Sequence, residues 1–192
     1  MSSDAPGFDR SLSLIAEELG SVVERLAAAD DASAEALVDE IARARRVFVH
    51  GAGRSGLALR MTAMRLMHLG LDVHVVGETT TPAIVEGDVL LTASGSGTTE
   101  SIVRAARTAV EAGARVALIT TATDSPLAEL ASATLVVPAA AKLDRSMTAS
   151  AQYAGGLFEQ TVVLIGDALF HTLWQRSGRT ADELWPRHAN LE

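Results

Sequence analysis

Cysteine is absent from the 192 residues of this chain. Its absence excludes disulfide bonds and thiolate sites, and it is consistent with a reducing compartment. The N-terminus also lacks an apolar segment, because residues 1–10 carry Asp4 and Asp9 in place of the hydrophobic stretch of a signal peptide. We therefore expect a cytoplasmic protein.

Long hydrophobic runs free of polar groups are missing too. The most apolar stretch, residues 153–174, contains Glu159, Asp167 and His171. Three polar groups in a segment of this length favour a buried helix over a membrane span. We expect no membrane partner.

Basic residues are in deficit, with 16 Lys and Arg against 24 Asp and Glu, so the formal net charge is −8 and the pI is about 5.1. An acidic surface repels a phosphate backbone, and we expect no nucleic-acid partner. The hydrophobic content of 48% and the chain length suffice for one domain with a sizeable core.

Short β-rich runs alternate with helical patterns after a helical region at residues 8–45, which Asp30-Asp31 should divide. The predicted strands are 46–50, 72–76, 88–93, 115–120 and 134–137, and the later predicted helices are about 55–69, 99–112, 126–131 and 150–176. Such alternation requires crossover connections, and near-continuous Val, Leu and Ile runs fit strands covered on both faces. The sequence predicts a three-layer α/β/α sandwich, with a five-stranded parallel sheet in a single domain.

The first predicted strand leads into Gly51-Ala52-Gly53-Arg54-Ser55-Gly56, which opens a helix. Backbone N–H groups at a helix N-terminus favour an anion. The string also matches the dinucleotide fingerprint G-x-G-x-x-G, which requires an acidic residue at the end of the second strand. Asp72 begins that strand and Glu78 lies too far along, so neither is well placed. This loop alone leaves a nucleotide, another anion or a simple tight turn open.

A second loop, Ser94-Gly95-Ser96-Gly97-Thr98-Thr99, follows the third predicted strand and again opens a helix. Its hydroxyl and N–H groups can all donate hydrogen bonds to phosphate oxygens. A Ser/Gly string can also be a flexible linker, but this one is too short for that role. Ser94 and Thr99 can cap the helix as well as bind phosphate. The pair of loops favours a phosphate cradle.

These two loops, in this order and at this separation, resemble the SIS (sugar isomerase) domain, and more finely the 6-phospho-3-hexuloisomerases. The stretches that carry the resemblance, besides the two loops, are Met64-Arg65-Leu66-Met67-His68-Leu69-Gly70, Val76-Gly77-Glu78-Thr79-Thr80-Thr81-Pro82, Gly156-Leu157-Phe158-Glu159-Gln160 and Arg187-His188-Ala189-Asn190-Leu191-Glu192. The resemblance runs from about residue 10 to the C-terminus. It implies a flavodoxin-like SIS domain at residues 46–192, and we expect the helices of residues 1–45 to pack on the core and on a subunit interface.

The resemblance implies conversion of D-arabino-3-hexulose 6-phosphate to fructose 6-phosphate through a cis-enediol, as in the ribulose monophosphate pathway of formaldehyde fixation. This chemistry needs a base and a group that polarises the oxygens, but no redox cofactor or metal. Glu159 is the expected base, because its helical neighbours are mostly small and apolar and desolvation raises a carboxylate pKa. His188 is the second catalytic candidate. On sequence alone it is a solvated tail residue, whereas the resemblance implies that it reaches a neighbouring subunit's site.

The remaining candidates bind substrate. Their side chains or backbone N–H groups would contact the phosphate, the sugar hydroxyls or an enediolate oxygen: Gly53, Arg54, Ser55, Glu78, Ser94, Ser96, Thr98 and Thr99. Alternative interpretations are a solvated Arg54 and an arginine-paired structural Glu159. The other four histidines, His50, His68, His74 and His171, show no metal-ligand spacing, and no metal is expected.

The resemblance also implies a homodimer or homotetramer, with a sugar phosphate as ligand and hexulose-phosphate synthase as a functional partner. Two rival functions belong to the same domain type. One is a sugar-phosphate sensor that binds without turnover, and the other is an isomerase of a heptose or arabinose phosphate. The presence of both Glu159 and His188 without an attached DNA-binding domain favours the hexulose isomerase.

Overall fold

A computed structural model describes residues 7–29, 32–139 and 150–191. Its centre is a sheet of five parallel strands in the order β2-β1-β3-β4-β5. The strands are β1 (Val47–Gly51), β2 (Val73–Val75), β3 (Val89–Ala93), β4 (Arg115–Thr120) and β5 (Ala133–Val136). This is the flavodoxin-like order, whose direction reverses between β1 and β3. The predicted five-stranded parallel sheet is confirmed.

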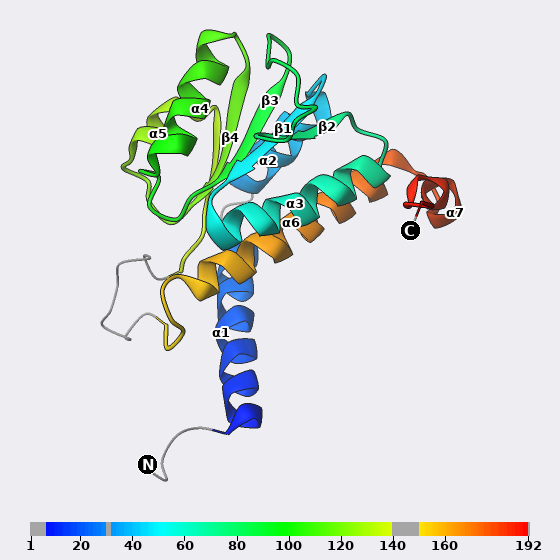
Figure 1. Ribbon diagram of the computed structural model, residues 1–192. Coiled ribbons are helices and arrows are strands. Elements are labelled where there is room, and N and C mark those ends of the chain that lie inside the picture. The colour runs from blue at the N-terminus through cyan, green and yellow to red at the C-terminus, as the bar shows by residue number, and fades with distance from the viewer. Residues whose placement is uncertain (1–6, 30–31, 140–149, 192) are drawn as a thin grey trace.

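Helices cover both faces of the sheet (Figure 1). They are α1 (Phe8–Ala28), α2 (Ala32–Arg43), α3 (Gly53–His68), α4 (Glu100–Glu111), α5 (Pro126–Leu130), α6 (Gly156–Ser177) and α7 (Ala181–Leu184), followed by a 3₁₀ turn at Trp185–Arg187. The helices α2, α3 and α6 share one core cluster with the sheet, and α4 and α5 share a second cluster on the other face. The chain is a single three-layer α/β/α domain, as predicted.

Side chains of successive strand residues point to opposite faces, which divides the core. Val47 and Val49 of β1 pack in the cluster under α3, whereas Phe48 between them packs on the α4 side. Both faces of β3 are buried, and all five of its residues are less than 2% exposed. This burial explains why the strands read as unbroken apolar runs.

The helix α6 begins six residues later than the predicted start near residue 150. Ala154 and Gly155 adopt positive φ angles of 49° and 82°, a left-handed conformation that a right-handed helix excludes. Gly178, with φ of 65°, ends the helix as predicted. The predicted break at Asp30-Asp31 lies outside the described residues.

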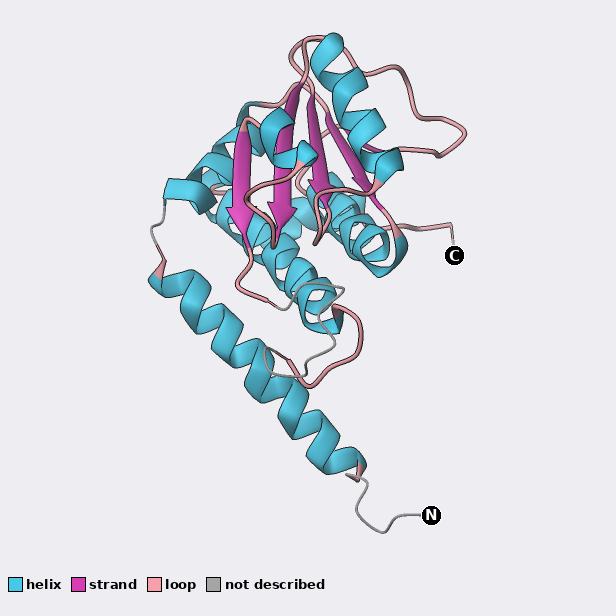
Figure 2. Ribbon diagram, turned by 90° about the vertical axis from the view of Figure 1, so that its left-hand side faces the viewer, coloured by secondary structure: helices cyan, strands magenta, loops and turns pink. Residues whose placement is uncertain are grey.

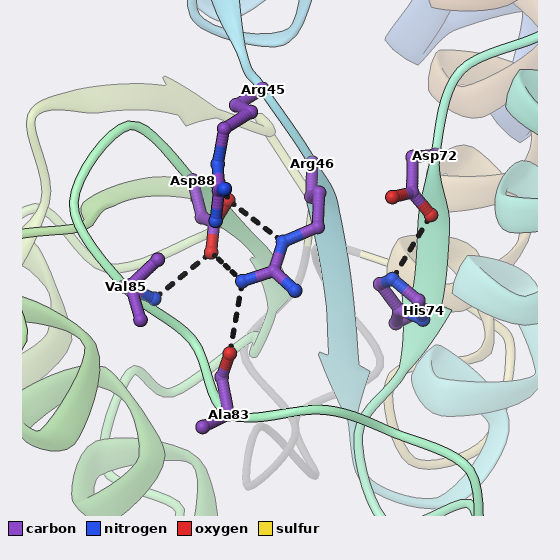
Figure 3. Close-up of polar contacts among 7 residues, drawn as sticks. All are labelled: Arg45, Arg46, Asp72, His74, Ala83, Val85 and Asp88. Atoms are coloured by element: carbon purple, nitrogen blue, oxygen red, sulfur yellow. Dashed lines mark hydrogen bonds and ion pairs between the residues drawn. The ribbon is translucent and has the colours of Figure 1, made fainter.

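A buried carboxylate braces the amino-terminal edge of the sheet (Figure 3). Asp88, just before β3, is fully buried and accepts hydrogen bonds from Arg46 at 3.0 and 2.6 Å, from Arg45 at 3.2 Å and from the Val85 N–H at 2.9 Å. Arg46 also donates to the Ala83 carbonyl at 2.9 Å. Burial alone would raise the pKa of Asp88, but these hydrogen bonds outweigh it and lower the pKa below its usual value.

The first helix, α1, extends away from the sheet, and its N-terminal half stands apart from the other helices (Figures 1 and 2). Its exposed apolar side chains include Phe8, Leu12 and Val23. None of the helices in the described part of the chain is long and apolar enough to cross a membrane.

Candidate active site

A pocket of about 140 Å³ lies at the carboxyl edge of the sheet, where β1 and β3 turn into their helices. This is the position where the strand order reverses, and open α/β sheets bind ligands in such crevices. Three segments line it: Ala52, Gly53 and Ser55 after β1; Ala93, Ser94, Gly95, Ser96, Thr99 and Ile102 around the second loop; and Ala154, Gly155, Phe158 and Glu159 at the start of α6.

The first loop is shaped by its glycines. A Cβ atom on Gly51 would lie 2.9 Å from the backbone of Gly56, and a Cβ on Gly56 would collide with the Gly51 carbonyl oxygen. Gly53 adopts a positive φ of 56° and begins α3, so its N–H group is among those without a helical partner. Ser55, in the first turn, is buried against the pocket. The loop therefore offers backbone N–H donors and one hydroxyl, which are groups that bind anions in other proteins.

The second loop contributes three hydroxyl-bearing residues to the same pocket. Ser94 is buried, and its Oγ lies 3.3 Å from Oγ1 of Thr99, the N-cap residue of α4. Ser96 is exposed and accepts a hydrogen bond from the Thr98 hydroxyl at 2.9 Å. Thr98 itself lies outside the pocket wall. Two helix N-termini, those of α3 and α4, therefore converge on one small cavity rich in hydroxyls.

Two threonines at the end of β4 hold the second loop, and sequence reasoning missed them. Thr120 and Thr121 both donate from Oγ1 to the Gly95 carbonyl, at 3.2 and 2.8 Å. The Gly97 carbonyl accepts from the Leu127 N–H at 3.2 Å. The sequence signal that could have indicated Thr120 and Thr121 is their position at the carboxyl end of β4, the parallel strand next to β3.

Glu159 and Arg54 meet at the edge of the pocket. Glu159 lies in the first turn of α6, and its Oε2 is 3.1 Å from Nη1 of Arg54 at the start of α3. The Glu159 side chain is 18% exposed, whereas that of Arg54 is 61% exposed. The expected surroundings of Glu159, small and apolar, are thus wrong in one respect. The carboxylate faces a guanidinium contributed by the first loop, and this contact joins two predicted site residues.

Glu78 and His188 are not brought to this pocket within the chain. Glu78 follows β2 and pairs with Arg60 on the exposed side of α3. The His188 ring stacks on His68 with 4.1 Å between centroids and lies 4.7 Å from the Trp185 ring. His188 follows α7, beyond the C-terminal end of α6, whereas Glu159 lies in the first turn of α6 beside the pocket (Figure 1).

Two histidines near these segments have altered pKa values. Burial lowers the pKa of His50, the penultimate residue of β1, which lies on the α4 side of the sheet. Burial, and then the neighbouring His188 and Arg65, lower the pKa of His68. Within residues 7–29, 32–139 and 150–191, no three His, Asp or Glu side chains are grouped so as to hold a metal ion.

Fold and site together define a class: a flavodoxin-like α/β protein with a pocket, lined by two helix N-termini and several hydroxyl groups, at the switch point of its sheet. The particular family follows from its match to a family model, that of the SIS domain, which covers residues 40–160. The chain belongs to the SIS domain family, as its two loops predicted.

Relatives within this family are similar over nearly the whole chain. The 3-hexulose-6-phosphate isomerase of Mycobacterium gastri is 54% identical over 182 residues, which cover 95% of this chain and 90% of the relative. The enzyme of the same name from Bacillus subtilis is 37% identical over 180 residues, which cover 93% of this chain and 97% of the relative. A solved structure from Methanococcus jannaschii, for which a 3-hexulose-6-phosphate isomerase function was inferred, superposes with a TM-score of 0.80 at 30% identity, covering 95% and 99%.

Proposed function

We propose that this chain isomerises D-arabino-3-hexulose 6-phosphate to fructose 6-phosphate. The observation that carries the proposal is a carboxylate paired with an arginine, Glu159 with Arg54, at the wall of a pocket built from two phosphate-type loops. The relatives from Mycobacterium gastri and Bacillus subtilis, named for this activity, support the substrate assignment.

The phosphate group would bind between the two loops. Ser55, Ser94, Ser96 and Thr99 supply hydroxyl donors, and the N-termini of α3 and α4 supply backbone N–H groups. The threonine hydrogen bonds to Gly95 fix the second loop before substrate arrives. Anchoring at the phosphate leaves the sugar carbons to extend toward Glu159.

Glu159 would act as the base that moves the carbon-bound proton. It takes the proton from C2, beside the C3 carbonyl, and the C2–C3 double bond of a cis-enediol forms as the C3 oxygen takes up a proton. Glu159 then returns a proton to C3 while the C2 oxygen loses its proton and becomes the carbonyl. No electron acceptor is needed. Arg54, which lies beside Glu159, would stabilise negative charge on the enediol oxygens.

His188 would serve the pocket of a neighbouring subunit. A helix of 22 residues is about 33 Å long at 1.5 Å per residue, so α6 separates the two ends at which Glu159 and His188 lie. A homodimer, or a homotetramer built from two dimers, would bring the tail of one chain to the pocket of another. The helices of residues 1–45 and the exposed apolar row Leu57, Met61 and Met64 on α3 are the surfaces we assign to subunit contacts.

In the cell, the enzyme would act in the cytoplasm on the product of hexulose-phosphate synthase, within the ribulose monophosphate pathway of formaldehyde fixation. The test is product analysis. The protein is mixed with hexulose 6-phosphate made by such a synthase, and fructose 6-phosphate is measured, with arabinose and heptose phosphates as comparison substrates. Binding of hexulose 6-phosphate without product would indicate a sensor, and turnover of only a comparison substrate would indicate a different isomerase.

A further inference from the structure

The carboxylate of Glu18, midway along α1, is bound to a segment more than 130 residues away. It accepts hydrogen bonds from Ser150 Oγ at 2.7 Å, from the Ala151 N–H at 2.7 Å and from Gln152 Nε2 at 3.0 Å. Burial alone would raise the pKa of Glu18, but these hydrogen bonds outweigh it and lower the pKa. Glu18 therefore holds its partners as a carboxylate at neutral pH.

The segment that Glu18 holds leads directly into the pocket. A tight turn follows Gln152, closed by a hydrogen bond from the Gly156 N–H to the Tyr153 carbonyl at 3.1 Å. Its two central residues, Ala154 and Gly155, both have positive φ angles, and both line the pocket. The turn also positions the first turn of α6, because the Glu159 N–H donates to the Gly155 carbonyl at 3.1 Å.

Ala154 makes this turn strained. A turn with two positive φ angles favours Gly, Asn or Asp, and a side chain with a Cβ costs about 1 kcal/mol in the left-handed region. Strained residues persist where their surroundings fix them. The hydrogen bonds of Glu18 to residues 150–152 fix the chain immediately before the turn.

Gln152 extends this contact toward the reacting groups. A Cβ atom on Gly156 would lie 3.4 Å from Gln152 Oε1 and 3.7 Å from Arg54 Nη1, so the amide and the guanidinium approach the same point of the backbone. Arg54 in turn pairs with Glu159. A polar row thus runs from α1 through the amide of Gln152 to the catalytic carboxylate.

We propose that Glu18 is a positioning residue for the isomerase site: it holds the Ala154-Gly155 turn and thereby sets where the first turn of α6 presents Glu159. The inference rests on the proposed function for its catalytic consequence. Its structural part, that Glu18 orders the entry of α6, stands without turnover.

The test compares Glu18→Gln with Glu17→Gln, a neighbouring exposed glutamate on the same helix. An amide at position 18 loses the charge and one acceptor oxygen, so the Ala154-Gly155 turn loosens. We expect kcat to fall about 10-fold or more, because small displacements of a reacting group are costly, with KM nearly unchanged since neither phosphate loop is touched. Amide hydrogen exchange over residues 151–159 should accelerate in Glu18→Gln and stay unchanged in the control.

A rescue experiment separates positioning from general stabilisation. Ala154→Gly removes the left-handed strain, so adding it to Glu18→Gln should recover part of kcat and slow the exchange of residues 151–159. Should Glu18→Gln not fold, Ser150→Ala removes one of the three donors and is measured in its place. Unchanged kcat and exchange in the position 18 variant, or no recovery with glycine at position 154, would overturn the proposal. If the original protein has no isomerase activity but Glu18→Gln still accelerates hydrogen exchange of residues 151–159, the proposed function is refuted and the ordering role of Glu18 stands.

Discussion

Arg54 and Glu159, 105 positions apart in the chain, lie with Nη1 and Oε2 3.1 Å apart at the pocket wall. The contact arises because α3 and α6 run in parallel from the pocket. The same pair of helices meets again further along, where Arg65 Nε lies 3.8 Å from Asp167 Oδ1. Two arginine–carboxylate pairs thus lie on one helix–helix interface, and of their four residues only Glu159 lines the pocket.

This repetition gives a matched control for the base. Glu159→Gln keeps the shape of the side chain and removes its basicity, so we expect kcat to fall about 10²–10⁴-fold with little change in KM. Asp167→Asn makes the same chemical change in the second pair and should leave both constants near their original values. Steady-state kinetics of the two variants measures this. Full activity in Glu159→Gln would remove Glu159 from the proposed chemistry.

The serines of the second loop should govern affinity. Ser94→Ala and Ser96→Ala each remove a hydroxyl from the pocket, and phosphate contacts are largely the same in ground and transition states. We expect KM to rise about 10-fold, since a hydrogen bond to a charged group contributes about 1.5 kcal/mol, with kcat little changed. Ser33→Ala, at an exposed position near the start of α2, is the control. A KM that stays constant in both loop variants would exclude the cradle.

Hybrid oligomers test whether His188 serves a neighbour. Glu159→Gln and His188→Ala chains, each expected to be nearly inactive alone, are co-expressed with different tags, and the hybrids are purified through both tags. In a hybrid dimer, one of the two sites combines an intact Glu159 with an intact His188 from the other chain. Activity well above either parent is expected. Verified hybrids that stay inactive would contradict the shared site.

The buried Asp88 makes stability depend on pH (Figure 3). Its lowered pKa means that its contribution is present above the unfolded value near 4 and is lost as the pH falls through the lower folded value. Asp88→Asn should cost about 3 kcal/mol of unfolding free energy at pH 7, because it leaves Arg46 without its buried partner. The difference in unfolding free energy between Asp88→Asn and the original chain should shrink below about pH 4, where Asp88 itself becomes protonated.

The control for this measurement is Asp39→Asn, which breaks exposed pairs with Arg43, one helical turn away, and with Arg176. Such surface pairs contribute less than about 1 kcal/mol. Urea denaturation at pH 7 and pH 3 compares the two variants. Equal losses at both pH values in Asp88→Asn would mean that the charge of Asp88 does not stabilise the fold.

Sequence patterns predicted the central strands β1, β3 and β4 well because most of their residues are buried on both faces. The run from Arg115 to Thr120 was predicted at the bounds observed, and the others differ by one residue at one or both ends. The prediction failed at the start of α6. The helix was expected from about residue 150, but residues 150–152 are hydrogen-bonded to Glu18 and the helix begins only at Gly156. The short helix α7 was also missed, although Thr180 and Glu183 form a capping box that the spacing displays.

Contacts between distant segments explain what the sequence did not reveal about the site. The loops were predictable since each follows a strand and opens a helix. The pairing of Arg54 with Glu159 depends on how α3 and α6 pack side by side, for which no local spacing gives a signal. Glu78 was expected among the substrate-binding residues, but it pairs with Arg60 outside the pocket.

The packing of Gly51 against Gly56 bears on how short glycine strings are interpreted. Each position excludes a side chain because the other glycine's backbone occupies the space, and Gly53 supplies the left-handed residue between them. Any strand that enters a helix through so close a turn would select the same three glycines, whatever the helix then binds. The string G-x-G-x-x-G therefore indicates a close approach between two backbone segments. A search that takes it as proof of a nucleotide-binding site will also collect sugar-phosphate proteins as false positives.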